Sequence, residues 1–110
     1  MLDAEIVGAI SNWQLMRFEY QGKLRVVEPH VYGHNRGADQ ILTYQVDGES
    51  GSGELPGWRR FFVEKIEELE ILPERFEGPR PDMEDEMAFG QTFMVIEDVP
   101  RVRRGLLEVV

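Results

Sequence analysis

A basic and aromatic group of side chains in this sequence has the chemistry of a ligand-binding site. Trp58, Arg59 and Arg60 follow one another, and Arg25 lies on an earlier predicted strand. A guanidinium group matches the two oxygens of a phosphate or carboxylate, and an indole ring offers a stacking face for a planar base. The group predicts recognition of an anionic ligand. The alternative is that Trp58 lies in the core and the arginines pair with Glu19 or Glu28.

A second candidate group consists of His30, Tyr32 and His34, which alternate with other residues in an extended segment. Side chains repeat every two residues along a strand, so these three are predicted to share one face. They could line a pocket with Arg36 nearby, or they could be ordinary residues of an edge strand. Two histidines without a third ligand at a suitable spacing do not predict a metal site.

Other motifs do not support catalysis or cofactor binding. The run from Gly48 to Gly53 lacks the Gly-Lys-Ser/Thr ending of a phosphate loop, so a flexible hairpin loop is expected there. The acidic residues 82–86 do not have the spacing of a calcium loop. Ser50 and Ser52 have no histidine and acid at a recognisable spacing. We therefore predict a protein that is not an enzyme and that uses no metal or cofactor.

Length and composition limit the classes of protein that remain. The chain has 110 residues, which is enough for one domain. It has no cysteine, which excludes disulfides and thiolate chemistry. No apolar run approaches the roughly 18 residues that a membrane span needs, and the acidic N-terminus does not resemble a secretion signal. We expect a cytoplasmic protein that does not bind membranes.

The net charge of −9 is spread unevenly. Residues 13–63 contain six basic and six acidic side chains and are neutral, whereas residues 64–86 contain ten acidic and three basic ones, a net of −7. The chain as a whole should repel nucleic acid at long range, because binding to phosphates depends on clustered lysine and arginine. A local anion site within residues 13–63 remains compatible with this charge distribution.

The first part of the chain predicts a helix followed by a hairpin. Asp3 can cap a helix over 3–12, whose apolar residues are spaced to face a core. Residues 15–20 alternate as in a half-buried strand, Gln21-Gly22 is suited to a tight turn, and residues 23–28 form the partner strand. Pro29 is expected at the end of that strand or at an edge, and Gly33 and Gly37 to bracket a polar loop.

The second part of the chain predicts further strands. Residues 41–46 alternate with Tyr44 on one face, residues 47–57 form a loop, and residues 58–63 are apolar enough for a central strand. A turn of helix is expected at 64–67, a strand at 68–72, a linker at 77–86 and a strand at 91–96. Short strands with glycine turns predict a mainly β fold, a small barrel of about five strands or a sandwich. The apolar residues 106–110 are expected to dock on the domain or on a second copy.

The chain from about Ile6 to Phe76 resembles a WYL domain, and most closely the short, free-standing proteins of that type. The motifs that carry the resemblance are, in order, Ala9-Ile10, Phe18-Glu19-Tyr20, Arg25-Val26-Val27-Glu28-Pro29, His30-Val31-Tyr32-Gly33, Ile41-Leu42-Thr43-Tyr44, the run from Tyr44 to Gly53, Gly57-Trp58-Arg59, and Phe61-Phe62-Val63-Glu64-Lys65-Ile66.

The resemblance implies an SH3-like, Sm-like β-barrel with a preceding helix. It also implies a role, because WYL domains accompany bacterial transcription regulators and defence proteins and sense a ligand such as a nucleotide or nucleic acid. Two departures bear on that role. The Trp-Tyr-Leu that names the family falls on Asp39-Gln40-Ile41, and an arginine usual in the last strand falls on Phe62. Both changes put nucleic-acid binding in question.

These observations lead to one hypothesis and one alternative. We expect a short helix over 1–12, a WYL-like barrel over 13–76, and an acidic linker and C-terminal extension over 77–110. The function expected is a non-catalytic, ligand-sensing regulatory module for a nucleotide or oligonucleotide, acting as a homodimer or with a transcription-regulation partner. The alternative is a protein–protein interaction module that uses the acidic stretch 64–86 and the apolar tail. The predicted ligand-binding residues are Arg25, His30, Tyr32, Tyr44, Trp58 and Arg59.

Overall fold

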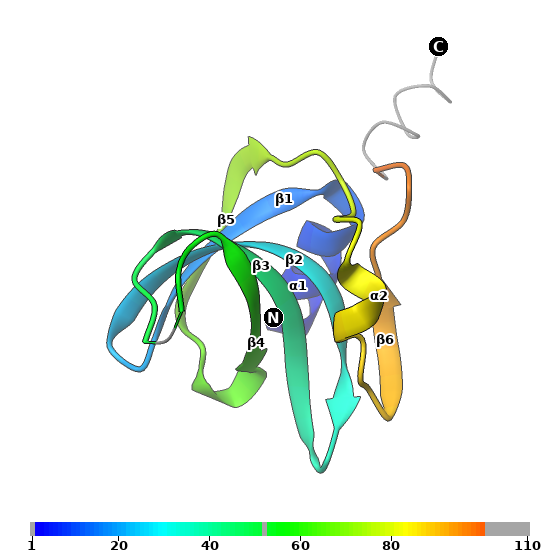
Figure 1. Cartoon of the computed structure of the whole chain (residues 1–110), viewed down its shortest axis with the longest axis horizontal. Coiled ribbons are helices and arrows are strands. Elements are labelled where there is room, and N and C mark those ends of the chain that lie inside the picture. The colour runs from blue at the N-terminus through cyan, green and yellow to red at the C-terminus, as the bar shows by residue number, and fades with distance from the viewer. Residues whose placement is uncertain (1, 52, 101–110) are drawn as a thin grey trace.

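The fold is built on one antiparallel β-sheet of six strands with a short helix at its N-terminal end (Figure 1). The computed structural model describes residues 2–51 and 53–100. In chain order the elements are α1 (Leu2–Asn12), β1 (Gln14–Tyr20), β2 (Lys23–Asn35), β3 (Ala38–Gly48), β4 (Gly57–Phe62), a 3-10 turn η1 (Val63–Lys65), β5 (Glu67–Arg75), α2 (Met83–Glu86) and β6 (Gln91–Val95). The prediction of a mainly β fold with a leading helix is confirmed.

The strands follow the order β4-β3-β2-β1-β5. The sixth strand, β6, pairs with residues 31–34 of β2, beyond the part of β2 that pairs with β1. The two end strands, β4 and β5, do not pair with each other in the described part of the chain, so the sheet is not closed. The prediction of a central strand at 58–63 is therefore wrong. β4 is apolar although it is an end strand, because one of its faces packs into the core. Phe61 is buried on that face, whereas Phe62 is partly exposed.

The sheet nevertheless curls strongly, as aromatic contacts between β1 and β4 show. Two strands separate β1 from β4, which would place them about 14 Å apart in a flat sheet. The ring centroid of Phe61 lies 5.0 Å from that of Phe18 and 4.7 Å from that of Tyr20. The Tyr20 hydroxyl also accepts a hydrogen bond of 3.2 Å from the backbone N–H of Phe62. We call the side that carries Phe18 and Phe61 the inner face and the opposite side the outer face.

The hydrophobic core lies between α1 and the inner face. Ile6 and Ile10 of α1 are fully buried with Met16, Val27 and Ile41 of the sheet. The predicted helical spacing of the apolar residues therefore positions them as expected, and α1 lies against one end of the curled sheet (Figure 1).

β2 is longer than predicted because it continues through Pro29. Its pairing with β1 ends at Val27, and its pairing with β6 begins at Val31, while β3 pairs with it throughout. Pro29 lies in the interval between the two partners, where a missing N–H does not remove a ladder hydrogen bond on that side. Of the two positions expected for Pro29, the strand end is wrong. The edge position agrees with the structure, because neither β1 nor β6 pairs with β2 at Pro29.

Gly33 belongs to β2, so the polar loop expected between Gly33 and Gly37 is reduced to a tight turn at Arg36-Gly37. Both turn residues have positive φ, 52° and 83°, as a two-residue hairpin requires. Gly33 is needed for another reason. A Cβ atom there would lie 2.4 Å from the backbone oxygen of Gln91, so only glycine lets β6 approach this closely.

We expect the substitution Gly33→Ala to destabilise the protein by about 1–3 kcal/mol, because the methyl group must displace backbone atoms of β6. Chemical denaturation measures this free energy of unfolding. Gly8→Ala is the matched control, since nothing lies within 4 Å of its added Cβ and alanine is favoured over glycine in a helix by roughly 0.5–1 kcal/mol. Equal stability of the two variants would contradict the close approach.

The segment after β5, predicted as a linker, lies against the outer face of the sheet (Figure 1). Arg60 of β4 donates hydrogen bonds to the backbone oxygens of Glu86 (2.7 Å) and Ala88 (3.0 Å) and lies over the ring of Phe89. The strand expected at 91–96 is confirmed as β6. The apolar tail 106–110, for which docking was expected, falls outside the described residues. Within residues 2–51 and 53–100, no helix is long and apolar enough to cross a membrane.

Candidate functional site

Three of the six predicted ligand-binding residues meet on the outer face. The strand register places Tyr44 opposite Trp58, and their ring centroids lie 5.3 Å apart. The ring of His30 lies 5.0 Å from that of Trp58 and stacks on Phe76 at 5.6 Å. These contacts form one aromatic cluster on β2, β3, β4 and Phe76, the residue that follows β5.

Tyr32 does not join His30, so the prediction of one shared face for His30, Tyr32 and His34 is wrong. The register between β2 and β3 shifts between Pro29 and Val31, which is a β-bulge. A bulge inserts one extra residue and so breaks the two-residue alternation of side chains. His30 therefore contacts the outer cluster, whereas Tyr32 is buried, donates a hydrogen bond to Asp3 of α1 and contacts Phe93 of β6.

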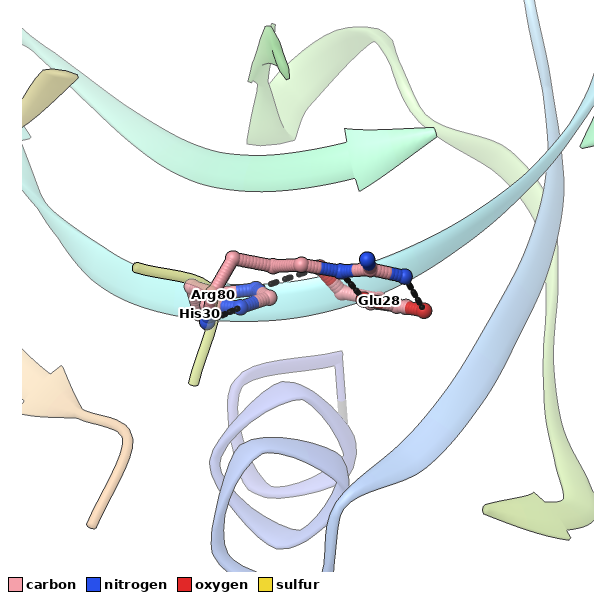
Figure 2. Close-up of polar contacts among 3 residues, drawn as sticks. All are labelled: Glu28, His30 and Arg80. Atoms are coloured by element: carbon pink, nitrogen blue, oxygen red, sulfur yellow. Dashed lines mark hydrogen bonds and ion pairs between the residues drawn. The ribbon is translucent and has the colours of Figure 1, made fainter. Parts of the chain in front are cut away.

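Beside the aromatic cluster lies a polar triad that joins β2 to the segment after β5 (Figure 2). The guanidinium of Arg80 donates two hydrogen bonds of 2.8 Å to the two carboxylate oxygens of Glu28, and it lies 4.2 Å from the centre of the Tyr44 ring. The Glu28 side chain is only 6% exposed, whereas that of Arg80 is 41% exposed. The bidentate bond to Glu28 raises the pKa of Arg80 further above its usual value.

His30 is held in one neutral tautomer by its two ring nitrogens. Nδ1 lies 2.8 Å from the backbone oxygen of Glu28 and must donate to it, while Nε2 accepts a hydrogen bond of 3.2 Å from the backbone N–H of Arg80. Both contacts are drawn in Figure 2. Complete burial lowers the pKa of His30, with the backbone bond to Glu28 acting against this shift. His30 therefore fixes Arg80 from the backbone side and stays neutral at pH 7.

We expect the free energy of unfolding to fall on acidification because of His30. Its pKa in the folded protein lies below the unfolded value of 6.5, so the unfolded chain binds the proton first and stability is lost as the pH falls from 6.5 towards the folded pKa. The slope approaches about 1.4 kcal/mol per pH unit for one proton. Urea denaturation between pH 7.5 and 5 measures it. His30→Gln should lose this part of the slope, whereas His34→Gln, at an exposed position, should keep it.

A surface pocket of about 360 Å³ opens beside this cluster. Trp58, Arg59 and Arg60 of β4 border it, together with Arg36 from the β2–β3 turn and Glu86 of α2. Arg36 is exposed and makes no hydrogen bond or ion pair with the described residues. The basic and aromatic group expected from the sequence thus borders one pocket, with Arg36 added and Arg25 absent. We call it the arginine pocket.

Arg25 lies on the inner face instead. Arg59 borders the pocket from β4, but it alternates with Trp58 along the strand, so its side chain lies on the inner face. Arg25 is 4% exposed, and its guanidinium lies 5.7 Å and 5.4 Å from the ring centres of Tyr20 and Phe61. Arg59 donates hydrogen bonds to the Ser50 hydroxyl at 3.1 and 3.2 Å and to the backbone oxygens of Trp58 and Glu54. Neither arginine pairs with Glu28, the partner that the structural alternative proposed, because Arg80 occupies it.

Sequence reasoning did not identify Arg80 or Phe76 as neighbours of the aromatic cluster. Arg80 lies between two prolines in a stretch without apolar periodicity, and it reaches Glu28 from 52 residues away. One signal was present: Glu28 precedes Pro29 on a strand, and a glutamate buried there requires a cation. Which cation supplies the charge depends on where the chain returns after β5.

Among the described residues, no three histidine, aspartate or glutamate side chains come together in a group that could hold a metal ion. Comparison of the chain with protein-family models, curated proteins and solved structures found no match. A function for this chain is therefore proposed from the geometry of the site and from the sequence resemblance of residues 6–76.

Proposed function

We propose that the chain is a free-standing, non-catalytic ligand-sensing module of the WYL type. The resemblance of the chain from Ile6 to Phe76 to a WYL domain supports this proposal. The architecture also supports it, with a leading helix followed by antiparallel strands in the order β4-β3-β2-β1-β5. The curl that brings Phe61 against Tyr20 is compatible with the SH3-like, Sm-like barrel that the resemblance implies. The proposal assigns no catalytic residue.

The observation that carries the proposal is that Trp58, Arg36 and Arg60 border one pocket. Its volume of about 360 Å³ falls within the range of small-molecule sites. Guanidinium groups bind phosphate oxygens and an indole ring stacks on a base, so the ligand class that fits is a nucleotide or the end of an oligonucleotide. Arg60 is also tied to the backbone of Glu86 and Ala88, which couples an occupied pocket to the segment covering the outer face.

We expect one of a panel of mononucleotides, cyclic dinucleotides and short oligonucleotides to raise the melting temperature. A ligand at 100 times its Kd adds about 2.7 kcal/mol, which corresponds to roughly 10 °C or more in a chain of this size. Arg36→Asn should weaken binding about tenfold, the equivalent of about 1.4 kcal/mol. Asparagine is chosen because it tolerates the positive φ of Arg36.

Arg17→Gln is the matched control, since it removes one positive charge from an exposed pair with Glu70 outside the pocket. It should leave the shift unchanged. A shift that Arg36→Asn and Trp58→Leu both leave intact would place the ligand elsewhere, and no shift with any member of the panel would overturn the proposal.

The alternative, a protein–protein interaction module, is favoured by one observation. β5 lies at an end of the strand order, and Glu67, Glu68 and Glu70 on it are exposed. An edge strand with unpaired backbone groups and acidic side chains suits a basic partner segment. If this alternative holds, replacing the three glutamates by glutamine should abolish binding of a lysine-rich peptide, measured by calorimetry, and the nucleotide panel should give no shift.

A further inference from the structure

Arg25 is a buried cation without a carboxylate partner. Its guanidinium has five N–H donors, yet it makes two hydrogen bonds, to Gln45 Oε1 and to the backbone oxygen of Tyr20, both 3.4 Å long. Its Nε–H has no partner in the structure. None of the described acidic side chains forms an ion pair with it. A buried charge is strongly unfavourable unless it is paired.

A second positive charge lies on the same inner face. The register places Arg59 opposite Thr43, which is adjacent to the strand of Arg25. The charge of Arg59 lowers the pKa of Arg25, after the larger effect of burial. Glu49 acts in the opposite sense from the exposed surface of the loop. Burial and Arg59 therefore both disfavour the charge of Arg25, and an anion bound beside it would offset both effects.

The described loop residues 49–51 and 53–56 contact this end of the sheet. A Cβ at Gly48 would lie 2.2 Å from the backbone oxygen of Leu24, beside Arg25, so glycine allows the loop to begin directly on β2. At the other end of the loop, a Cβ at Gly57 would lie 2.9 Å from Nη1 of Arg59. The loop thus approaches both arginines closely.

We infer that Arg25 binds one oxyanion group, a carboxylate or a phosphate, on the inner face of the sheet. The planar guanidinium presents Nε–H and an Nη–H side by side, which suits two oxygens of one ligand group. This site lies on the opposite face from Trp58 and Tyr44, and it does not depend on nucleotide binding in the arginine pocket. The rings of Tyr20 and Phe61 hold the guanidinium in place for the ion.

The test uses inorganic phosphate and, separately, acetate as probes of the full-length protein. Each anion is titrated against chloride at constant ionic strength, and the arginine Nε–H signals are followed by ¹⁵N NMR. We expect a saturable shift of one Nε–H signal, identified by its absence in the Arg25→Met variant, and a saturable rise in melting temperature. Arg25→Met should lose the saturable rise and keep only the general stabilisation by phosphate that arises from its exclusion from protein surfaces.

Two further variants make the outcomes distinct. Arg25→Lys keeps the charge without the two-pronged geometry and should weaken the response about tenfold. Arg36→Asn should leave it unchanged, so failure of the nucleotide proposal and failure of this one can be told apart. A response to phosphate alone assigns a phosphoryl group, and a response to acetate alone assigns a carboxylate. No saturable shift with either anion, or the same response in Arg25→Met, overturns the inference.

Discussion

The variant Arg80→Ala should lose about 2–3 kcal/mol of unfolding free energy. Removing one partner of a buried ion pair leaves the other as an uncompensated charge, at a cost of about 3–5 kcal/mol. The lower value is expected here because the Arg80 side chain is 41% exposed and water can reach part of the site. Glu28, at 6% side-chain exposure, is left without its two hydrogen bonds. Urea denaturation at pH 7 measures the loss.

The exposed pair between Arg17 and Glu70 is the matched control. Both side chains are about half exposed, at 44% and 53%, so Arg17→Ala should cost less than about 1 kcal/mol. The double variant Glu28→Gln with Arg80→Met should recover most of the stability lost in Arg80→Ala, because no buried charge remains. Equal losses in Arg80→Ala and Arg17→Ala would show that the Glu28 carboxylate is solvated. The pair would then not hold the segment over 77–86 against the outer face.

The second large effect is a gain in stability. We expect Arg25→Met to raise the free energy of unfolding by about 1–3 kcal/mol in chloride buffer, since replacing buried charged groups by well-packed apolar ones often stabilises by about 1–4 kcal/mol. Methionine is flexible enough to fill the space between Tyr20 and Phe61. Chemical denaturation without oxyanions measures the gain.

The reason for such a gain is the unpaired guanidinium described above, whose Nε–H has no partner. The matched control is Arg75→Met: Arg75 is exposed, and the bond from its Nε to the backbone oxygen of Asn12 should contribute within about 1 kcal/mol. A loss of stability in Arg25→Met would mean that the contacts with the rings and with Gln45 outweigh the burial of the charge. Arg25 would then be a structural residue.

Several features of this protein followed from local sequence alone. The helix, the hairpin at Gln21-Gly22, the strand around Tyr44 and the last strand agree with the structure, because residue spacing and turn chemistry act over a few neighbouring residues. The sequence also shows that residues 13–63 are neutral and that residues 64–86 are acidic. Of the predicted group of Trp58, Arg59, Arg60 and Arg25, Trp58 and Arg60 lie together beside the pocket, since side chains two residues apart on a strand share a face.

Other features were decided by contacts between distant parts of the chain. The bulge after Pro29 separates His30 from Tyr32, and it depends on β2 changing partners from β1 to β6. Gly33 indicated a loop because glycine usually disfavours strands, whereas here it allows β6 to approach. Likewise, β4 lies at an end of the sheet although its composition is typical of a central strand.

The six predicted ligand-binding residues illustrate the same division. Their residue types were suited to binding, but the sequence could not place them on faces: His30, Tyr44 and Trp58 meet outside, Arg25 and Arg59 lie inside, and Tyr32 contacts α1. The identity of the cation beside Glu28 was decided by the return of the chain to the outer face 52 residues later. Local periodicity fixes which residues can form a strand, whereas the partners of a buried charge are fixed by the packing of the whole chain.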